Sequence, residues 1–133
     1  MVFKELCKEL EAKIVESYER GVTLEEAEKL ASEFLGALIK LSSELKKAGL
    51  DSRMRKRGFK AIKSAIRKEE IKKHDKKPTE GQLEDLVNTD ELCLNEEKAM
   101  DESLENKEEL QRYYDIFREA HIHYRGISRG KFE

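Results

Sequence analysis

The 133-residue sequence contains no tryptophan, one proline, two cysteines and no long apolar run. Cys7 and Cys93 lack a CxxC spacing, so neither a disulfide framework nor a cysteine metal site is indicated. The longest nearly uncharged segment, residues 34–39, is too short to cross a bilayer. Charged residues also stand in the first ten positions, where a signal peptide has an apolar run. We therefore expect a cytoplasmic protein that makes no membrane contact.

Motifs of enzymes are also missing from this sequence. There is no GxGxxG, P-loop, GxSxG or HExxH. Acid pairs such as Glu25 and Glu26 are so numerous that none is marked as catalytic. His121 and His123, two residues apart on a helix, point in different directions, and no further ligand motif completes a metal site. We predict no enzymatic activity, no metal site and no cofactor.

Charge and helix-forming residues dominate the remaining sequence. Charged residues make up 42% of the chain and hydrophobic residues 38%, which is typical of long helices. The length suits one domain, and no strand-like alternation extends beyond a few residues. We predict an all-α fold: a single helical domain over residues 1–133, in which four to five helices form an elongated bundle.

The first half of the chain carries clear helix boundaries. Apolar residues recur every three or four positions over 3–18, which predicts a helix that ends near Arg20 and Gly21. Thr23 is suited to cap a second helix, with Glu26 three residues on. Gly49 is predicted to end that second helix. Because the connection is short, residues 1–49 are expected to form an antiparallel helical hairpin.

Three further helices are predicted beyond residue 50. Asp51 or Ser52 is suited to cap a basic helix over residues 51–77, which Pro78 terminates. Thr79 and Gln82 form a second capping signature, which predicts a short helix near residues 80–87. A long amphipathic helix then completes the segment 79–128.

The long C-terminal helix carries a heptad pattern that is convincing only in its second half. Asn106 stands at a seam position, where a buried Asn could fix the register of a coiled coil; the alternative is that it is simply exposed. Self-association would bury the large seam residues of the second half, and we predict a homo-oligomer on this basis. These residues are Leu110, Tyr113, Phe117 and Tyr124.

Positive charge is concentrated in one segment of an acidic chain. Residues 53–77 contain twelve Lys or Arg and three Asp or Glu, whereas the whole chain has a net charge of -2. At about 100° per residue, five of these cations form an arc roughly opposite Phe59, Ile62 and Ile66. These five candidate nucleic-acid-binding residues are Arg53, Lys56, Lys60, Lys63 and Arg67.

Cations spaced along a helix can follow a phosphate backbone, which gives salt-dependent binding without sequence preference. Two alternatives remain open: acids of the last helix, such as Glu105, Glu108 and Glu109, or a partner protein neutralise the same charges. The aromatic residues follow helical periodicity and are better explained as core than as a base-stacking platform. Single-stranded nucleic acid is the expected partner.

The order of elements after residue 50 resembles the UvsY-type recombination mediators of tailed phages. The resemblance covers about residues 50–128: the basic helix, the segment KKPTE at 76–80, the short helix QLEDLV at 82–87, and a long helix ending in YRGI at 124–127. It implies a small helical oligomer that binds single-stranded DNA and assists a recombinase. By this resemblance, the family's DNA-contacting basic stretch corresponds to seven candidate nucleic-acid-binding residues: Arg53, Arg55, Lys56, Arg57, Lys60, Lys63 and Arg67.

A second class of function depends on the acidic second half of the chain. Residues 80–109 are strongly acidic, which departs from the resemblance. Such a region could dock on a basic protein surface or mimic DNA, as in a helical adaptor or inhibitor. In that case the residues that contact the partner would be Glu96, Glu97, Asp101 and Glu102.

Overall fold

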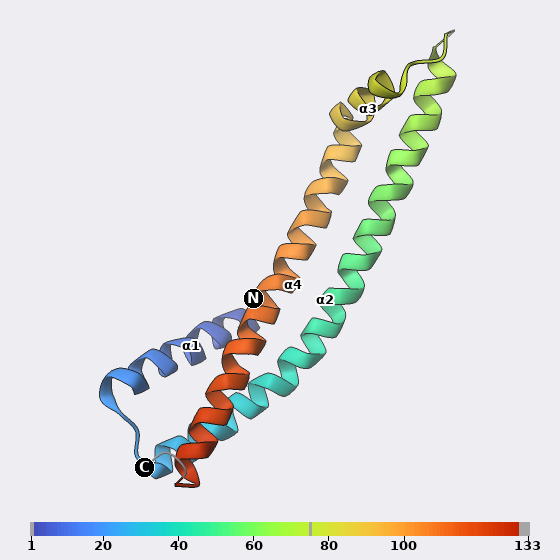
Figure 1. Cartoon of the computed structure of the whole chain (residues 1–133). Coiled ribbons are helices and arrows are strands. Elements are labelled where there is room, and N and C mark those ends of the chain that lie inside the picture. The colour runs from blue at the N-terminus through green and yellow to red at the C-terminus, as the bar shows by residue number, and fades with distance from the viewer. Residues whose placement is uncertain (1, 75, 131–133) are drawn as a thin grey trace. The chain divides into compact units, whose positions relative to one another are not determined.

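The residues that the structure describes form four helices, which confirms the predicted all-α class. A computed structural model of the chain describes residues 2–74 and 76–130, and the side chain of residue 2 is outside the description. The helices are α1 (Val2–Arg20), α2 (Leu24–Lys73), α3 (Glu80–Thr89) and α4 (Glu91–Ser128), shown in Figure 1. The described residues contain no strand.

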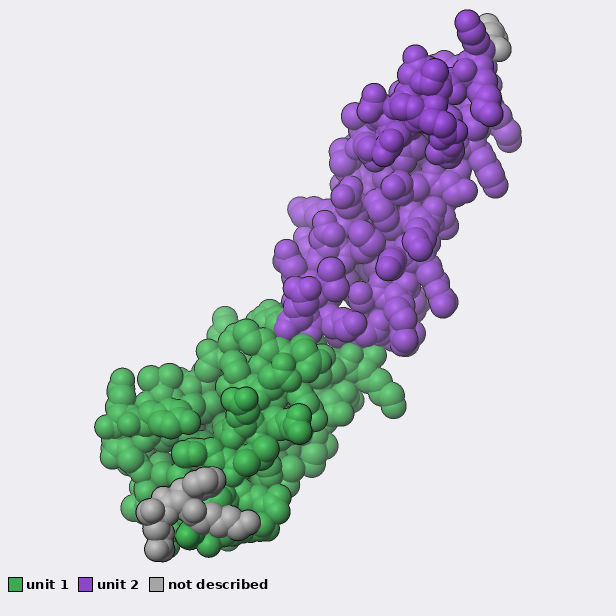
Figure 2. Space-filling view, viewed as in Figure 1, with its two compact units in different colours: residues 1–46, 109–133 green, residues 47–108 purple. Residues whose placement is uncertain are grey.

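The chain divides into two compact units, which Figure 2 shows in green and purple. Unit 1 comprises residues 1–46 and 109–133, and unit 2 comprises residues 47–108. In both units α2 and α4 run antiparallel. The carbonyl oxygen of Ala31 in unit 1 accepts a hydrogen bond from His121 Nδ1 at 2.9 Å. In unit 2, the Ser103 hydroxyl donates to Asp51 at 2.6 Å.

The connection between α1 and α2 follows its sequence signals. Gly21 has a φ of 80°, a left-handed conformation that ends α1 at little steric cost. Thr23 Oγ1 then accepts the backbone N–H of Glu26 at 3.1 Å, as predicted for a helix cap. The two helices form the predicted antiparallel pair, in which Lys13 contacts Glu33 at 3.0 Å and Arg20 contacts Glu26 at 3.3 Å.

Unit 1 contains most of the buried apolar side chains. Phe34 of α2 packs on Phe117 and Tyr124 of α4, with ring centroids 5.2 and 5.7 Å apart. The Ser17 hydroxyl donates to the Ile14 carbonyl at 2.9 Å, so the hydroxyl of Tyr124 is the donor in its contact with Ser17. The core side chains are Phe3, Cys7 and Leu10 from α1; Ala27, Ala31, Phe34, Ala37 and Leu41 from α2; and Leu110, Tyr113, Phe117, Ala120 and Tyr124 from α4.

Unit 2 has a thinner core, formed by one face each of α2, α3 and α4. Ile66, Val87 and Cys93 cluster, and Phe59 and Ile62 pack against them partly buried. The predicted capping box holds the start of α3: Thr79 Oγ1 accepts the Gln82 N–H, and Gln82 Oε1 accepts the Thr79 N–H. Local sequence therefore fixes where α3 begins.

The predicted helix break at Gly49 is wrong, because α2 continues from residue 24 to residue 73. A glycine that ends a helix adopts a positive φ, and among the described residues only Gly21 and Gly130 do so. Gly49 stays helical beside the buried Ala48. Asp51 does not cap a new helix and instead accepts the Ser103 hydroxyl. The basic helix also ends at Lys73, before the predicted residue 77, and residue 75 lies outside the described residues.

The heptad pattern of α4 leads to a second correction. Its first half is out of register, since Leu92 is 56% exposed while the neighbouring Cys93 is buried. In its second half Leu110, Tyr113, Phe117 and Tyr124 are all buried, but within unit 1 of a single chain. The premise that these side chains need a second copy to cover them is wrong. Asn106 is half-buried in unit 2.

Candidate nucleic-acid interface

The sequence-predicted cations of residues 53–67 are all exposed on the unit 2 part of α2. The opposite side of this helix segment carries Ile62 and Ile66, which belong to the core of unit 2. We define the α2 basic face by the exposed cations that lie at least about 100° around the helix from Ile62. These are Arg53, Lys56, Arg57, Lys60, Lys63, Arg67 and Lys68.

Most of the α2 basic face is unpaired. Across residues 2–74 and 76–130, no carboxylate lies within 4 Å of Arg53, Lys56, Arg57 or Lys60. Unpaired surface ammonium and guanidinium groups keep their full charge available to an anion. This part of the face is therefore open to a ligand without breaking an internal ion pair.

Two members of the α2 basic face have partners inside unit 2. Lys63 Nζ lies 5.2 Å from the centre of the Phe59 ring, in a cation–π contact. Arg67 forms an ion pair with Glu80 at the start of α3. Both side chains remain exposed, but their positions are restrained. Arg67 has to compete with Glu80 for any external anion.

Arg55 does not belong to the face, although the sequence reasoning included it. It lies about 20° around the helix from Ile62 and from Ile66, because seven and eleven residues are close to whole numbers of turns. It contacts Asp51 at 3.9 Å instead. Arg55 is therefore exposed, but it lies on the Ile62 and Ile66 side of α2 and pairs with an acid of its own helix.

Lys68 was missed by the sequence reasoning and belongs to the face. It stands eleven residues after Arg57, about 20° away around the helix. It is exposed, and no described carboxylate pairs with it. The same helical-wheel spacing that grouped the other cations was sufficient to find it.

Unit 2 has no net charge, but its positive and negative residues lie in different halves of its sequence. Residues 47–77 contain thirteen Lys or Arg against four Asp or Glu, while residues 78–108 contain two against eleven. Among the described residues of unit 2, Arg67–Glu80 is the ion pair that joins these two halves. Glu105 and Glu108 form no ion pair with α2, and Glu109 belongs to unit 1, where it contacts Lys4 at 3.1 Å. Neutralisation by these three acids is thus not seen.

The remaining candidate groups, two histidines and two cysteines, are packed or hydrogen-bonded within the fold. His121 donates to the Ala31 carbonyl, and His123 packs against Tyr18 with ring centroids 5.6 Å apart. Cys7 and Cys93 are buried, and that burial raises the pKa of both thiols. In the part of the chain that the structure describes, no three His, Cys, Asp or Glu side chains gather as metal ligands.

Comparisons with protein-family models, curated proteins and solved structures gave no match to this chain. No helix within residues 2–74 and 76–130 combines the length and apolar character that a membrane span requires.

Proposed function

We propose that the protein is a non-enzymatic nucleic-acid-binding accessory protein that holds a phosphate backbone on the α2 basic face. The observation that carries this proposal is the exposure of Arg53, Lys56, Arg57 and Lys60 without a carboxylate partner in the described chain. Charges that only solvated the helix would be expected to be mixed in sign, as they are on α1.

The dimensions of the face suit a strand of nucleic acid. From residue 53 to residue 68 the helix rises about 22 Å at 1.5 Å per residue. A duplex strand carries one phosphate per about 3.4 Å of axis, so this length matches about six phosphates. Seven cations along it can act together, each displacing condensed counterions.

Sequence-independent binding is expected because the face offers no platform for bases. Phe59 is the aromatic residue of this helix segment, and it packs against the core of unit 2. Lysine and arginine contacts to phosphate position a strand but do not read its bases. The resemblance to phage recombination mediators favours single-stranded DNA as the ligand, and this preference is part of the proposal.

The test is fluorescence anisotropy of a labelled single-stranded oligonucleotide, titrated with protein at several salt concentrations. With at least four phosphate contacts, the logarithm of the binding constant should fall with the logarithm of salt with a slope of about -3. Lys56→Gln/Lys60→Gln should weaken binding to all sequences and reduce that slope by about 1.4. A duplex of the same sequence measures the preference for single strands.

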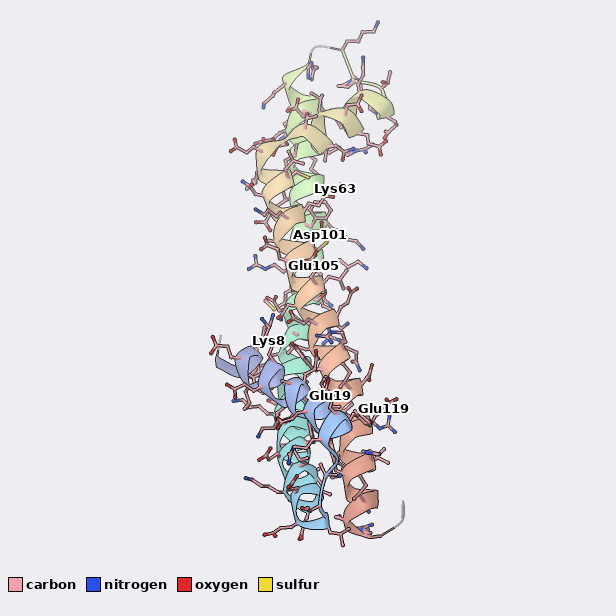
Figure 3. The ribbon with its side chains drawn as sticks, turned by 90° about the vertical axis from the view of Figure 1, so that its left-hand side faces the viewer. Lys8, Glu19, Lys63, Asp101, Glu105 and Glu119 are labelled. Atoms are coloured by element: carbon pink, nitrogen blue, oxygen red, sulfur yellow. The ribbon has the colours of Figure 1, made fainter. Side chains whose placement is uncertain are left out.

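The matched control is Lys8→Gln/Lys29→Gln, which removes the same charge from exposed, unpaired lysines of unit 1 (Lys8 is labelled in Figure 3). It should bind almost as the unmodified protein does. Equal losses in both variants would mean that net charge alone, and not the α2 basic face, governs binding. Absence of binding at low salt would remove the proposal altogether.

The helical adaptor or inhibitor remains the second candidate function. It is favoured by exposed acids of α4, including Glu97 and Asp101, that have no ion-pair partner in the described chain. This candidate predicts no nucleic-acid affinity at moderate salt and a protein complex that is lost when these acids are reversed to lysine.

A further inference from the structure

The outward side of α4 in unit 2 carries a row of acids that the proposed nucleic-acid interface does not use. We define the α4 acidic face as Glu97, Asp101, Glu105 and Glu108, at separations of four, four and three residues. This spacing puts all four within about 80° on the side of α4 opposite Ser103, which points to α2. Figure 3 labels Asp101 and Glu105 on this helix.

The α4 acidic face is open in a single chain. All four side chains are exposed, and none forms an ion pair or hydrogen bond with another described residue. Leu94, Glu97, Asp101 and Glu105 line a shallow groove along α4, in which Lys98 is the one cation. The groove therefore offers a negatively charged row with some apolar surface beneath it.

We propose that the α4 acidic face of one copy of this chain docks on the α2 basic face of a second copy. The argument is charge complementarity: the two halves of unit 2 carry an excess of nine positive and nine negative charges. A single chain joins these halves by one ion pair among its described residues, so both faces are left to an outside partner. A second copy supplies both complements at once and leaves no excess charge.

The lengths of the two rows are compatible with such docking. The α4 acidic face extends about 16 Å along its helix, and the α2 basic face about 22 Å. Four carboxylates can thus each meet a lysine or arginine, with cations to spare at one end. If the α2 basic face also binds nucleic acid, the second copy competes for it, and this competition alone rests on the proposed function.

The test is sedimentation velocity without nucleic acid, over a range of protein and salt concentrations. The chain should form dimers or larger species at 50 mM salt and dissociate by 500 mM salt. The reason is that the screening length for exposed charges is longer than about 10 Å below 0.1 M salt and shortens toward about 3 Å at 1 M. Lys56→Glu/Lys60→Glu and Asp101→Lys/Glu105→Lys should each weaken association at least tenfold. All four positions are exposed, so the fold, checked by circular dichroism, should persist.

Mixing the two charge-reversed variants gives the decisive result. In the first variant the charge of the α2 basic face falls from +7 to +3, and in the second the charge of the α4 acidic face falls from -4 to 0. Each variant keeps its other face intact, so the mixture should associate at low salt through the α4 acidic face of the first variant and the α2 basic face of the second. Matched controls are Lys8→Glu/Lys29→Glu and Glu9→Lys/Glu19→Lys, which make the same changes in net charge on exposed residues of unit 1. These controls should associate as the unmodified chain does.

Three outcomes would overturn the inference: a chain that stays monomeric at 50 mM salt, association that both charge-reversed variants retain, or a mixture that does not associate. Because these measurements contain no nucleic acid, they can fail while the anisotropy experiment succeeds. The reverse is also possible, so the two proposals are separately testable.

Discussion

At the scale of single residues, the polar contacts in the core of unit 1 are what sequence reasoning did not find. Ser17 is buried and bonded to Tyr124, from a helix more than a hundred positions away. His121 reaches the Ala31 carbonyl in the same way. Neither contact has a local signature, because each depends on which helices become neighbours. The apolar partners Phe34 and Phe117, in contrast, were identifiable from helical periodicity alone.

A pH prediction follows from the buried Cys7 thiol. Burial first, and Glu109 second, raise its pKa above the ordinary value of 9.0. In the unfolded chain the thiol ionises near pH 9 while in the folded chain it stays protonated. The stability that this difference provides is therefore complete below pH 9 and is lost as the pH rises toward the folded pKa. Urea unfolding at pH 8, 9 and 10 should show a falling free energy of unfolding.

The matched variant is Cys7→Ala, which removes the ionisable group. Its free energy of unfolding is lower at every pH because a buried atom is lost. Its decline between pH 9 and 10 should nevertheless be less steep, by at most about 1.4 kcal/mol per pH unit. An identical decline in both proteins would show that Cys7 does not contribute.

At the scale of helices, the starts at Thr23 and Thr79 were predicted correctly, whereas the break at Gly49 with a new start at Asp51 or Ser52 was wrong. The caps at Thr23 and Thr79 depend on side chains within three residues of the helix end, so local chemistry is enough to identify them. Gly49 has the composition of a helix stop, but α2 passes through it. There the packing of α2 along α4 in unit 2 outweighs a propensity cost of about 1 kcal/mol.

Two glycine substitutions should therefore have opposite effects. A Cβ at Gly49 would meet no atom within 4 Å, so Gly49→Ala should raise the free energy of unfolding by about 1 kcal/mol. Gly21 has equally open space but a positive φ, so Gly21→Ala should lower it by about 1 kcal/mol. Thermal or urea unfolding measures both. Destabilisation by Gly49→Ala would contradict a continuous α2.

The candidate site was predictable to the extent that it lies on one helix. Helical spacing grouped five of the seven cations of the α2 basic face, and Arg57 was added by the family resemblance. The same spacing excludes Arg55 once the buried side is known. What spacing could not provide is the partner of each charge. The Arg67–Glu80 pair joins two helices, and the buried residues of α4 belong to unit 1 and are no surface for a second copy.

At the scale of the whole molecule, the two units differ in what they hold. Unit 1 contains the larger apolar core, whereas unit 2 contains the opposed charges and a smaller core. The net charge of -2 of the chain hides this division, because residues 47–108 sum to zero. The aromatic core and both charged faces are thus assigned to different parts of the chain.

Hydrogen exchange can test this division in the intact protein. A bound single-stranded oligonucleotide should slow amide exchange in α2 after residue 47, since a ligand that binds only the native state disfavours opening. About 100-fold excess over the dissociation constant should slow exchange through local unfolding there by up to about 100-fold. Residues 24–46 of the same helix should change much less. Uniform protection of α2, or protection confined to unit 1, would contradict the assignment.

The distribution of tyrosine has a spectroscopic consequence. The chain has four tyrosines and no tryptophan, and Tyr18, Tyr113, Tyr114 and Tyr124 all belong to unit 1. Intrinsic fluorescence therefore reports on unit 1 alone, while far-ultraviolet circular dichroism records the helices of both units. Tyrosine fluorescence thus follows the melting of unit 1, and any further change in circular dichroism follows the melting of unit 2. The two can be compared without any label.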